Sequence, residues 1–162
     1  MAYLLDANVF IEAKNRYYRL DFCPAFWDWL IERNVEGQVF SIQKVEEDIK
    51  KMADELAMWA AARGPTFFLK PDPAVLAALG PVSSWAKGQH YEDAAVSDFL
   101  DSSDYYLVAH ALAHGHTVVS HEVSSNSLKN IKIPDACKGF GVECVLPFEM
   151  LSREQARFVL GR

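Results

Sequence analysis

One short stretch near the amino end limits the possible folds more than any other part of the chain. Tyr3, Leu4 and Leu5 form an apolar run that leads directly into Asp6, and a helix-like pattern follows at once. A buried strand that ends in a carboxylate is the usual way for an α/β domain to place a charge in its ligand crevice. Such a carboxylate is costly unless it is paired, hydrogen-bonded or bound to a cation. The alternative is that Asp6 simply caps the helix that follows it.

Strand-like and helix-like segments alternate along the rest of the sequence. Strands are predicted at 3–6, 38–41, 66–69, 117–120 and 142–145. Helices are predicted at 7–14, 24–33, 43–62, 73–79, 91–100, 104–114 and 152–160. This alternation is typical of α/β proteins, and the continuous apolar run at 117–120 indicates a parallel strand covered on both faces. We expect one domain over residues 1–162, with a mainly parallel sheet of four or five strands between two layers of helices.

The composition narrows the class of protein. Hydrophobic residues make up 51% of the chain and charged residues 23%, as in ordinary globular proteins. No apolar run is long enough to cross a bilayer, and the amino end lacks the features of a signal peptide. The three cysteines are scattered, as expected for reduced residues, so we predict a cytoplasmic protein with no membrane partner. The net charge of −6 disfavours general binding of nucleic acid through the overall field.

Acidic residues fall where predicted strands end or predicted helices begin. They are Asp6 after the first strand, Glu46, Glu47 and Asp48 after the second, Asp101 and Asp104 near the start of one helix, and Glu122 after the 117–120 strand. In a parallel sheet these positions share one edge, where carboxylates repel one another unless divalent cations lie between them. Oxygen ligands suit Mg²⁺ or Mn²⁺, and two such ions about 3.5–4 Å apart can activate water for phosphodiester cleavage. Because the helix dipole alone favours acids at helix starts, only the whole set indicates a site.

Three segments of the chain resemble motifs of the PIN domain, the nuclease fold of VapC-type toxins. Leu4–Phe10 resembles the opening motif, in which an aspartate is followed two residues later by asparagine. Asp104–Leu112 is similar to the helix that begins with an acid and has small residues where it packs on the sheet. Val118–Glu122 resembles the strand that ends in serine or threonine, any residue and an acid. The resemblance covers nearly the whole chain and implies a three-layer α/β/α PIN-like fold.

The resemblance implies a ribonuclease that depends on Mg²⁺ or Mn²⁺ and leaves a 5′-phosphate and a 3′-hydroxyl. Asp6 and Asp104 would be the main metal ligands, with Glu122 as a further ligand. Asn8 would hydrogen-bond to Asp6 and orient it. Ser120 and Asp101 would support the site. The expected partners are an RNA substrate, an antitoxin protein and a second copy of the chain.

The sequence departs from the family pattern at three places. Ala7 stands where a hydroxyl side chain is common, and Glu122 stands where aspartate is commoner. The middle catalytic acid is either Asp48 or Glu47. Asp48 shares a helix face with Val45 and Met52, apolar residues that are expected to point inward, whereas Glu47 also fits the family spacing. We favour Asp48 and keep Glu47.

Several other interpretations use the same residues. His110 and His114 are four residues apart on one predicted helix, as in a zinc pair, although no metalloprotease glutamate follows His110. The aromatic residues at 17–29 are either base-stacking or core residues. Six basic residues could contact phosphate, although a solvated face is the default for most of them: Lys14, Arg16, Lys50, Lys51, Lys129 and Lys132. A haloacid-dehalogenase-type phosphatase would need a second aspartate at position 8, and a PIN-like module that binds RNA or protein without cutting is the non-enzyme alternative.

Overall fold

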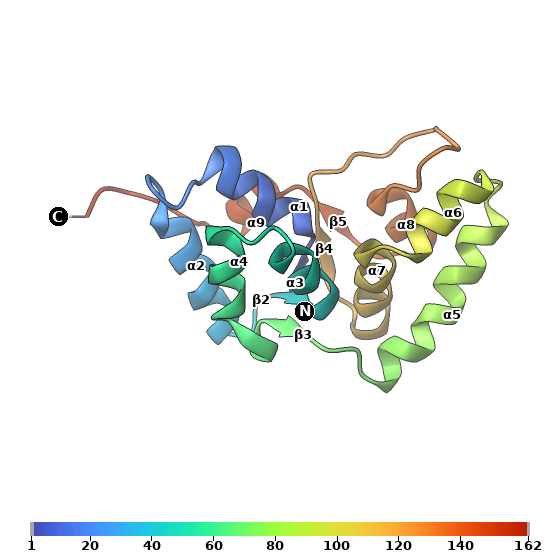
Figure 1. Cartoon of the computed structure of the whole chain (residues 1–162), viewed down its shortest axis with the longest axis horizontal. Helices are drawn as coiled ribbons and strands as arrows, with labels where there is room; N and C mark the ends of the chain where they lie inside the picture. Colours follow the sequence, from blue (N-terminus) through green and yellow to red (C-terminus); the bar gives the residue numbers. More distant parts are fainter. Residues whose placement is uncertain (1, 162) are drawn as a thin grey trace.

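Five parallel strands form the centre of the protein. The computed structural model describes residues 2–161, and its sheet has the strand order β3-β2-β1-β4-β5 (Figure 1). The strands are β1 (Tyr3–Leu5), β2 (Val39–Ile42), β3 (Phe68–Leu69), β4 (Thr117–Val119) and β5 (Cys144–Val145). Every neighbouring pair is parallel, which confirms the predicted α/β class and the number of strands.

Helices cover both faces of this sheet. Figure 1 shows one layer formed by α1 (Ala7–Glu12), α2 (Pro24–Val35), α4 (Glu55–Ala61) and α9 (Pro147–Arg153). The opposite layer is formed by α5 (Pro73–Gly88), α6 (Asp93–Leu100), α7 (Ser103–His114) and α8 (Ile133–Gly139). The short helix α3 (Gln43–Lys50) contacts α1, α4 and α7. The arrangement is therefore the expected three layers, α/β/α.

Strand β1 lies in the middle of the sheet, between β2 and β4. Leu4 pairs with Val118 and Leu5 with Val119, and all four side chains are fully buried. Their continuous apolar character follows from this burial on both faces. Since all five strands run in the same direction, their carboxyl ends meet at one edge, and the residue after Leu5 is placed there.

The predicted helix 43–62 is wrong as a single element, because the chain breaks between α3 and α4. Ala53 has a positive φ of 51°, and Asp54 starts α4 by accepting a hydrogen bond from the backbone N–H of Ala57 at 3.0 Å. Met52, which the apolar spacing placed on the inward face, is 40% exposed. The aspartate cap therefore overrides an apolar pattern that continues across the break.

Asp54 also joins α4 to the segment that follows α1. Its Oδ2 atom accepts a hydrogen bond from Lys14 Nζ at 2.8 Å. We predict that Asp54→Ala lowers the free energy of unfolding by about 1–2 kcal/mol, because the helix cap and the ion pair are lost together. Urea denaturation measures the change. Asp28→Ala, at an exposed position on α2, is the control and should change it by less than about 0.5 kcal/mol; equal effects would contradict the role of Asp54.

Helix α5 is longer than the predicted helix 73–79, because it continues through Pro81 to Gly88. Proline in a helix interior removes a hydrogen bond and is usually a helix breaker. Here the buried face of the helix outweighs that cost, since Val75, Ala78 and Val82 recur at steps of three and four and the helix packs along α7.

The carboxyl-terminal part of the chain also differs from the prediction. The expected helix at 152–160 is wrong, because α9 begins at Pro147 and ends at Arg153. Helix α8 was not predicted at all. Both helices start with a proline in their first turn, where proline is well tolerated, and that signal was available in the sequence.

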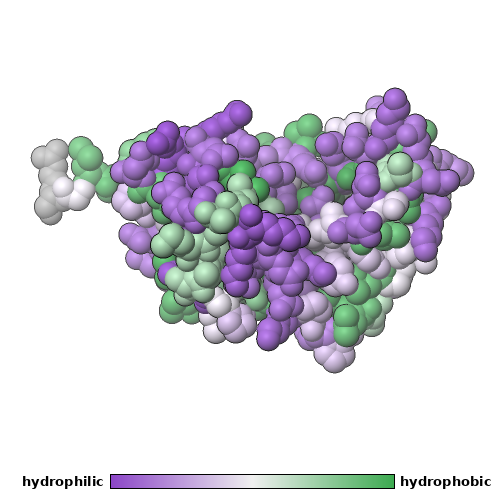
Figure 2. Space-filling view, in the orientation of Figure 1, coloured by the Kyte–Doolittle hydropathy of each residue, from purple (hydrophilic) through white to green (hydrophobic). Residues whose placement is uncertain are grey.

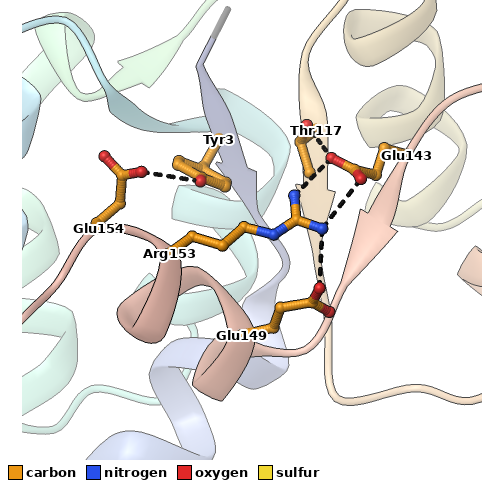
Figure 3. Close-up of polar contacts among 6 residues, drawn as sticks. All are labelled: Tyr3, Thr117, Glu143, Glu149, Arg153 and Glu154. Carbon is orange, nitrogen blue, oxygen red and sulfur yellow. Dashed lines mark hydrogen bonds and ion pairs between the residues drawn. The ribbon is translucent and has the colours of Figure 1, made fainter.

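A polar network attaches α9 to the amino edge of the sheet, opposite the edge that carries Asp6 (Figure 3). The two Nη atoms of Arg153 donate to Glu143 at 2.8 and 3.1 Å, and Nη2 also donates to Glu149 at 2.8 Å. The hydroxyl of Thr117, the first residue of β4, donates to Glu143 at 3.1 Å. The network thus fixes the last helix to the start of a central strand.

Hydrophilic residues cover most of the face seen in Figure 2, over helices of both layers. Within residues 2–161, no helix combines the length and the apolar character needed to span a bilayer.

Candidate active site

Asp6 lies at the carboxyl edge of the sheet, directly after β1, and is only 2% exposed. Its backbone N–H donates to the carbonyl of Val119 at 3.0 Å, so the chain stays paired with β4 as it reaches the edge. Its Oδ2 atom accepts a hydrogen bond from the Ser120 hydroxyl at 2.9 Å. Asp6 occupies the N-cap position of α1, yet its side chain makes no capping hydrogen bond with that helix. Capping therefore does not explain this buried acid.

Burial is the main reason why the pKa of Asp6 rises to about 6. The negative charge of Glu122 adds to the rise, while the hydrogen bond from Ser120 opposes it. The ionised form of Asp6 is therefore unfavourable in this buried position. This is expected for a carboxylate that a nearby positive charge would stabilise.

Asp104 lies in the first turn of α7 and is partly buried at the same edge. Its pKa is raised to about 8, mainly by burial and then by the negative charges of Asp6, Glu122 and Asp48 in that order. Lys132 is the opposing positive charge. Four acidic residues from four separate segments therefore interact through their charges at one edge of the sheet.

Ser120 links two of these acids. Its hydroxyl donates to Asp6 and also accepts a hydrogen bond from the backbone N–H of Glu122 at 3.1 Å. The Glu122 carboxylate accepts from the backbone N–H of Ile133, the first residue of α8, at 2.9 Å. Glu122 is thus anchored on the side of α8, where its Oε2 atom already has a partner.

The other predicted site residues differ in position. Asp48 is exposed, and its charge acts on Asp104. Glu47 is also exposed, but its charge is not among those that shift the pKa of Asp104. Asp101 is the exposed C-cap residue of α6, and its charge is not among those that shift the pKa of Asp104. Of the two candidates for the middle acid, Asp48 is the one whose charge acts on the site.

Asn8 does not take the place that the resemblance implied. It is exposed and lines a cavity with Glu122, and in the described part of the chain its side chain forms no hydrogen bond to Asp6. Its backbone N–H does act on that carboxylate and lowers the pKa of Asp6. The orienting hydrogen bond comes from Ser120 instead. The sequence prediction of the role of Asn8 is therefore not supported by this geometry.

The donor atoms at this edge suit a hard divalent cation. Asp6, Asp104 and Glu122 offer only carboxylate oxygens, the ligands preferred by Mg²⁺ and Mn²⁺. No three acidic, histidine or cysteine side chains of residues 2–161 converge into a complete ligand group. Mg²⁺ commonly keeps several waters and uses one or two carboxylates, so Asp6 and Asp104 fit such an ion without Glu122 as a direct ligand.

The histidines of α7 do not form the alternative zinc pair. His114 Nε2 lies 2.7 Å from the Asp72 carboxylate, whereas His110 Nε2 is buried and has no hydrogen-bond partner. Burial lowers the pKa of His110 to about 4, so its ring is neutral at pH 7. These rings lie in the carboxyl-terminal half of α7, while Asp104 lies in its first turn.

Two cavities meet at Glu122. One, of about 220 Å³, is lined by Asp104 and Glu122 together with Lys129, Asn130 and Lys132 from the loop before α8. The other, of about 370 Å³, is lined by Asn8, Glu12, Tyr17, His121 and Glu122. The sequence offered Lys129 and Lys132 as possible phosphate contacts, but it did not place them or His121 at this edge, because the segment 121–132 has no periodic pattern.

A five-stranded parallel sheet covered by helices on both faces, with acidic residues along its carboxyl edge, is a PIN-like α/β fold. The chain belongs to the DUF4411 family, described as a domain of unknown function, which it matches over residues 3–158.

Two solved structures share this fold. VapBC2 from Rickettsia felis, solved bound to a DNA fragment from their promoter, is 11% identical, with a TM-score of 0.52 over 90% of this chain and 98% of that chain. FitAcB from Neisseria gonorrhoeae is 19% identical, with a TM-score of 0.50 and the same two coverages. No curated protein matches the sequence.

Proposed function

We propose that the protein is a metal-dependent endoribonuclease that hydrolyses phosphodiester bonds of RNA with Mg²⁺ or Mn²⁺. The observation that carries the proposal is the interaction of Asp6 and Asp104 at the carboxyl edge of the sheet. Both are carboxyl groups whose pKa is raised by burial and by neighbouring negative charge. Such a pair is unfavourable without a cation and suits one well.

Each residue of the site has its own role in the proposed reaction. When bound, the cation supplies an activated water and neutralises charge on the phosphate. Asp6 and Asp104 would hold it, and Ser120 fixes the orientation of Asp6 through its hydrogen bond of 2.9 Å. Lys132, beside Asp104, offers a positive charge to the phosphate. Cleavage leaves a 5′-phosphate and a 3′-hydroxyl, as the PIN resemblance implies.

We further propose that this nuclease is the toxin of a toxin–antitoxin pair, acting in the cytoplasm as a homodimer. The PIN-like fold and the likeness to VapBC2 and FitAcB support this assignment. Expression of the wild-type chain should arrest growth, and co-expression of the product of a small neighbouring gene should relieve the arrest. Continued growth on expression of an active enzyme would contradict the toxin role.

A PIN-like module that binds RNA or protein without cutting is the second candidate. Two observations favour it: Ala7 lacks the hydroxyl common at that position, and the acids of the described chain form no ready-made group of three ligands. Cleavage activity separates the two candidates.

We predict that purified protein cleaves a labelled RNA pool in Mn²⁺ and that EDTA stops the reaction. Asp6→Asn and Asp104→Asn should each lower the rate by more than about a hundredfold, since even residues behind the metal ligands contribute 10- to 100-fold. Asp28→Asn, an exposed change on α2, should cleave like the wild type. Equal activity in all four preparations would reveal a contaminating nuclease and overturn the assignment of the site.

A further inference from the structure

We infer that Tyr17, His121 and Phe148 form a platform on which one unpaired base of the RNA stacks, in a groove made up of the two cavities beside Glu122. The inference rests on the proposed nuclease function and adds the way in which the RNA is held.

The platform consists of three aromatic rings from distant parts of the chain. Tyr17 ends the π-helical turn after α1, His121 follows β4, and Phe148 lies in α9. The rings of Tyr17 and His121 are stacked, with centroids 5.5 Å apart and an interplanar angle of 26°. Phe148 meets Tyr17 edge-on at 5.2 Å and His121 at 5.6 Å. Each ring is thereby held in place by the other two.

These rings remain accessible although they pack together. Tyr17 and Phe148 are each 44% exposed, so part of their aromatic surface is open to solvent. Tyr17 and His121 line the larger cavity, and His121 stands between Ser120 and Glu122 in the chain. An exposed, preassembled aromatic surface beside a phosphodiester-cleaving site is suited to base stacking, which tolerates any base because every base has a π-face.

The charge in the larger cavity favours a base over a phosphate. Glu12 lies in this cavity, and its Oε2 atom is 3.2 Å from Arg16 Nε. Glu12 and Glu122 supply carboxylate oxygens that can accept hydrogen bonds from N–H groups of a base, and the described residues that line this cavity include no lysine or arginine to attract a phosphate. The cavity therefore has aromatic and acceptor groups, which complement a nucleobase.

The smaller cavity has the opposite character. Lys129, Asn130 and Lys132 supply positive charge and hydrogen-bond donors, and Asp104 forms the wall nearest to the proposed cation. A phosphate of the RNA backbone fits there. Because Glu122 lines both cavities, a strand that places a base on the platform and a phosphate at the lysines passes over the acidic edge. A base can reach the platform only when it is unstacked and unpaired, so the substrate is a single strand.

The test uses one RNA of about ten nucleotides and derivatives that lack the base at one position in turn. With the wild type, removal of one particular base near the cut should lower kcat/KM about tenfold, the size expected for loss of one stacked base. In Tyr17→Leu, intact RNA should be cut about tenfold more slowly, and removal of the same base should have no further effect. Phe22→Leu, at a 62% exposed aromatic position that lines neither cavity, is the matched control and should behave like the wild type.

Two more measurements address the single strand and the phosphate. RNA annealed to its complement should be cut at least about tenfold more slowly than the free strand, since pairing withholds the base from the platform. In Asp104→Asn, which binds without cutting, quenching of a 2-aminopurine base at the identified position should report stacking and should disappear on adding Tyr17→Leu. Lys129→Gln should reduce the salt dependence of this binding by about 0.7 in the slope of log K against log salt.

The possible outcomes test the groove and the proposed nuclease function separately. If each base-free derivative lowers the cleavage rate of the wild type and of Tyr17→Leu by the same factor, the platform is wrong. The proposed nuclease function would still stand. Faster cutting of the duplex would overturn the single-strand requirement. If no RNA is cut or bound by the wild type, the proposed function itself fails, and the groove fails with it.

Discussion

Asp104→Asn should stabilise the metal-free protein at pH 7, although it removes a residue that the proposed reaction needs. The carboxyl group of Asp104 has a pKa of about 8 in the folded protein and about 3.9 in an unfolded chain. The folded state therefore binds this proton more tightly, and its stability falls as the pH rises from about 4 to about 8. At pH 7 the loss amounts to about 2–4 kcal/mol, and the neutral amide avoids it.

Thermal unfolding in EDTA measures this effect. The variant should melt roughly 5–10 °C above the wild type at pH 7, and the difference should shrink toward pH 5. Mn²⁺ should raise the Tm of the wild type, since a ligand that binds only the folded state stabilises it, and should have little effect on the variant. Asp28→Asn is the control for the loss of an exposed carboxylate and should leave the Tm unchanged. A lower Tm of Asp104→Asn at pH 7 would show that the acid has a structural role.

Phe10→Ala should destabilise the protein by about 3–5 kcal/mol, the range for truncation of a fully buried phenylalanine. Phe10 is completely buried on α1, immediately after the site, and its ring lies 5.9, 6.1 and 6.0 Å from the rings of Trp59, Phe67 and Phe68. Removal of the ring leaves a cavity between α1, α4 and β3. The lost contacts with the other three rings add to the lost burial.

Urea denaturation tests this prediction through the midpoint of the transition. Phe22→Ala is the matched control, because Phe22 is 62% exposed and its truncation should cost less than about 0.5 kcal/mol. Similar midpoints for the two variants would mean that the aromatic cluster around Phe10 contributes little to stability.

The sheet was largely predictable from sequence because each strand is a short apolar run with clear ends. The run that ends at Asp6 and the run at 117–120 both became central strands, and their order along the chain was enough to bring Asp6, Asp104 and Glu122 to one edge. Parallel topology does this without any knowledge of side-chain contacts, since all carboxyl ends share that edge.

The helices were predicted less well, and the reasons are local. The apolar spacing of 43–62 continues across the break between α3 and α4. It therefore gave no sign that Asp54 starts a new helix as its N-cap residue. At Pro81 the opposite occurred, because packing against α7 sustains a helix through a residue that usually ends one.

Details of the site depend on contacts that no periodicity encodes. The hydrogen bond from Ile133 to Glu122, the approach of Lys132 to Asp104 and the stacking of His121 on Tyr17 all involve the irregular segment after β4. Such a segment has no repeating pattern from which its path could be predicted. The hydrogen bond from the Ser120 hydroxyl to Asp6 comes from the end of a neighbouring strand, so the spacing of Asp6 and Asn8 could not indicate it.

The hydrogen bond between Ser120 and Asp6 joins residues 114 positions apart in the chain. During synthesis, Asp6 leaves the ribosome well before its neighbours in β4. Contacts of such long sequence separation form late and make folding slow. A nascent or truncated chain that ends before Glu122 therefore has its first aspartate but lacks the strand that holds it. The acidic edge is thus complete only after the segment through Glu122 has been synthesised and β4 has paired with β1.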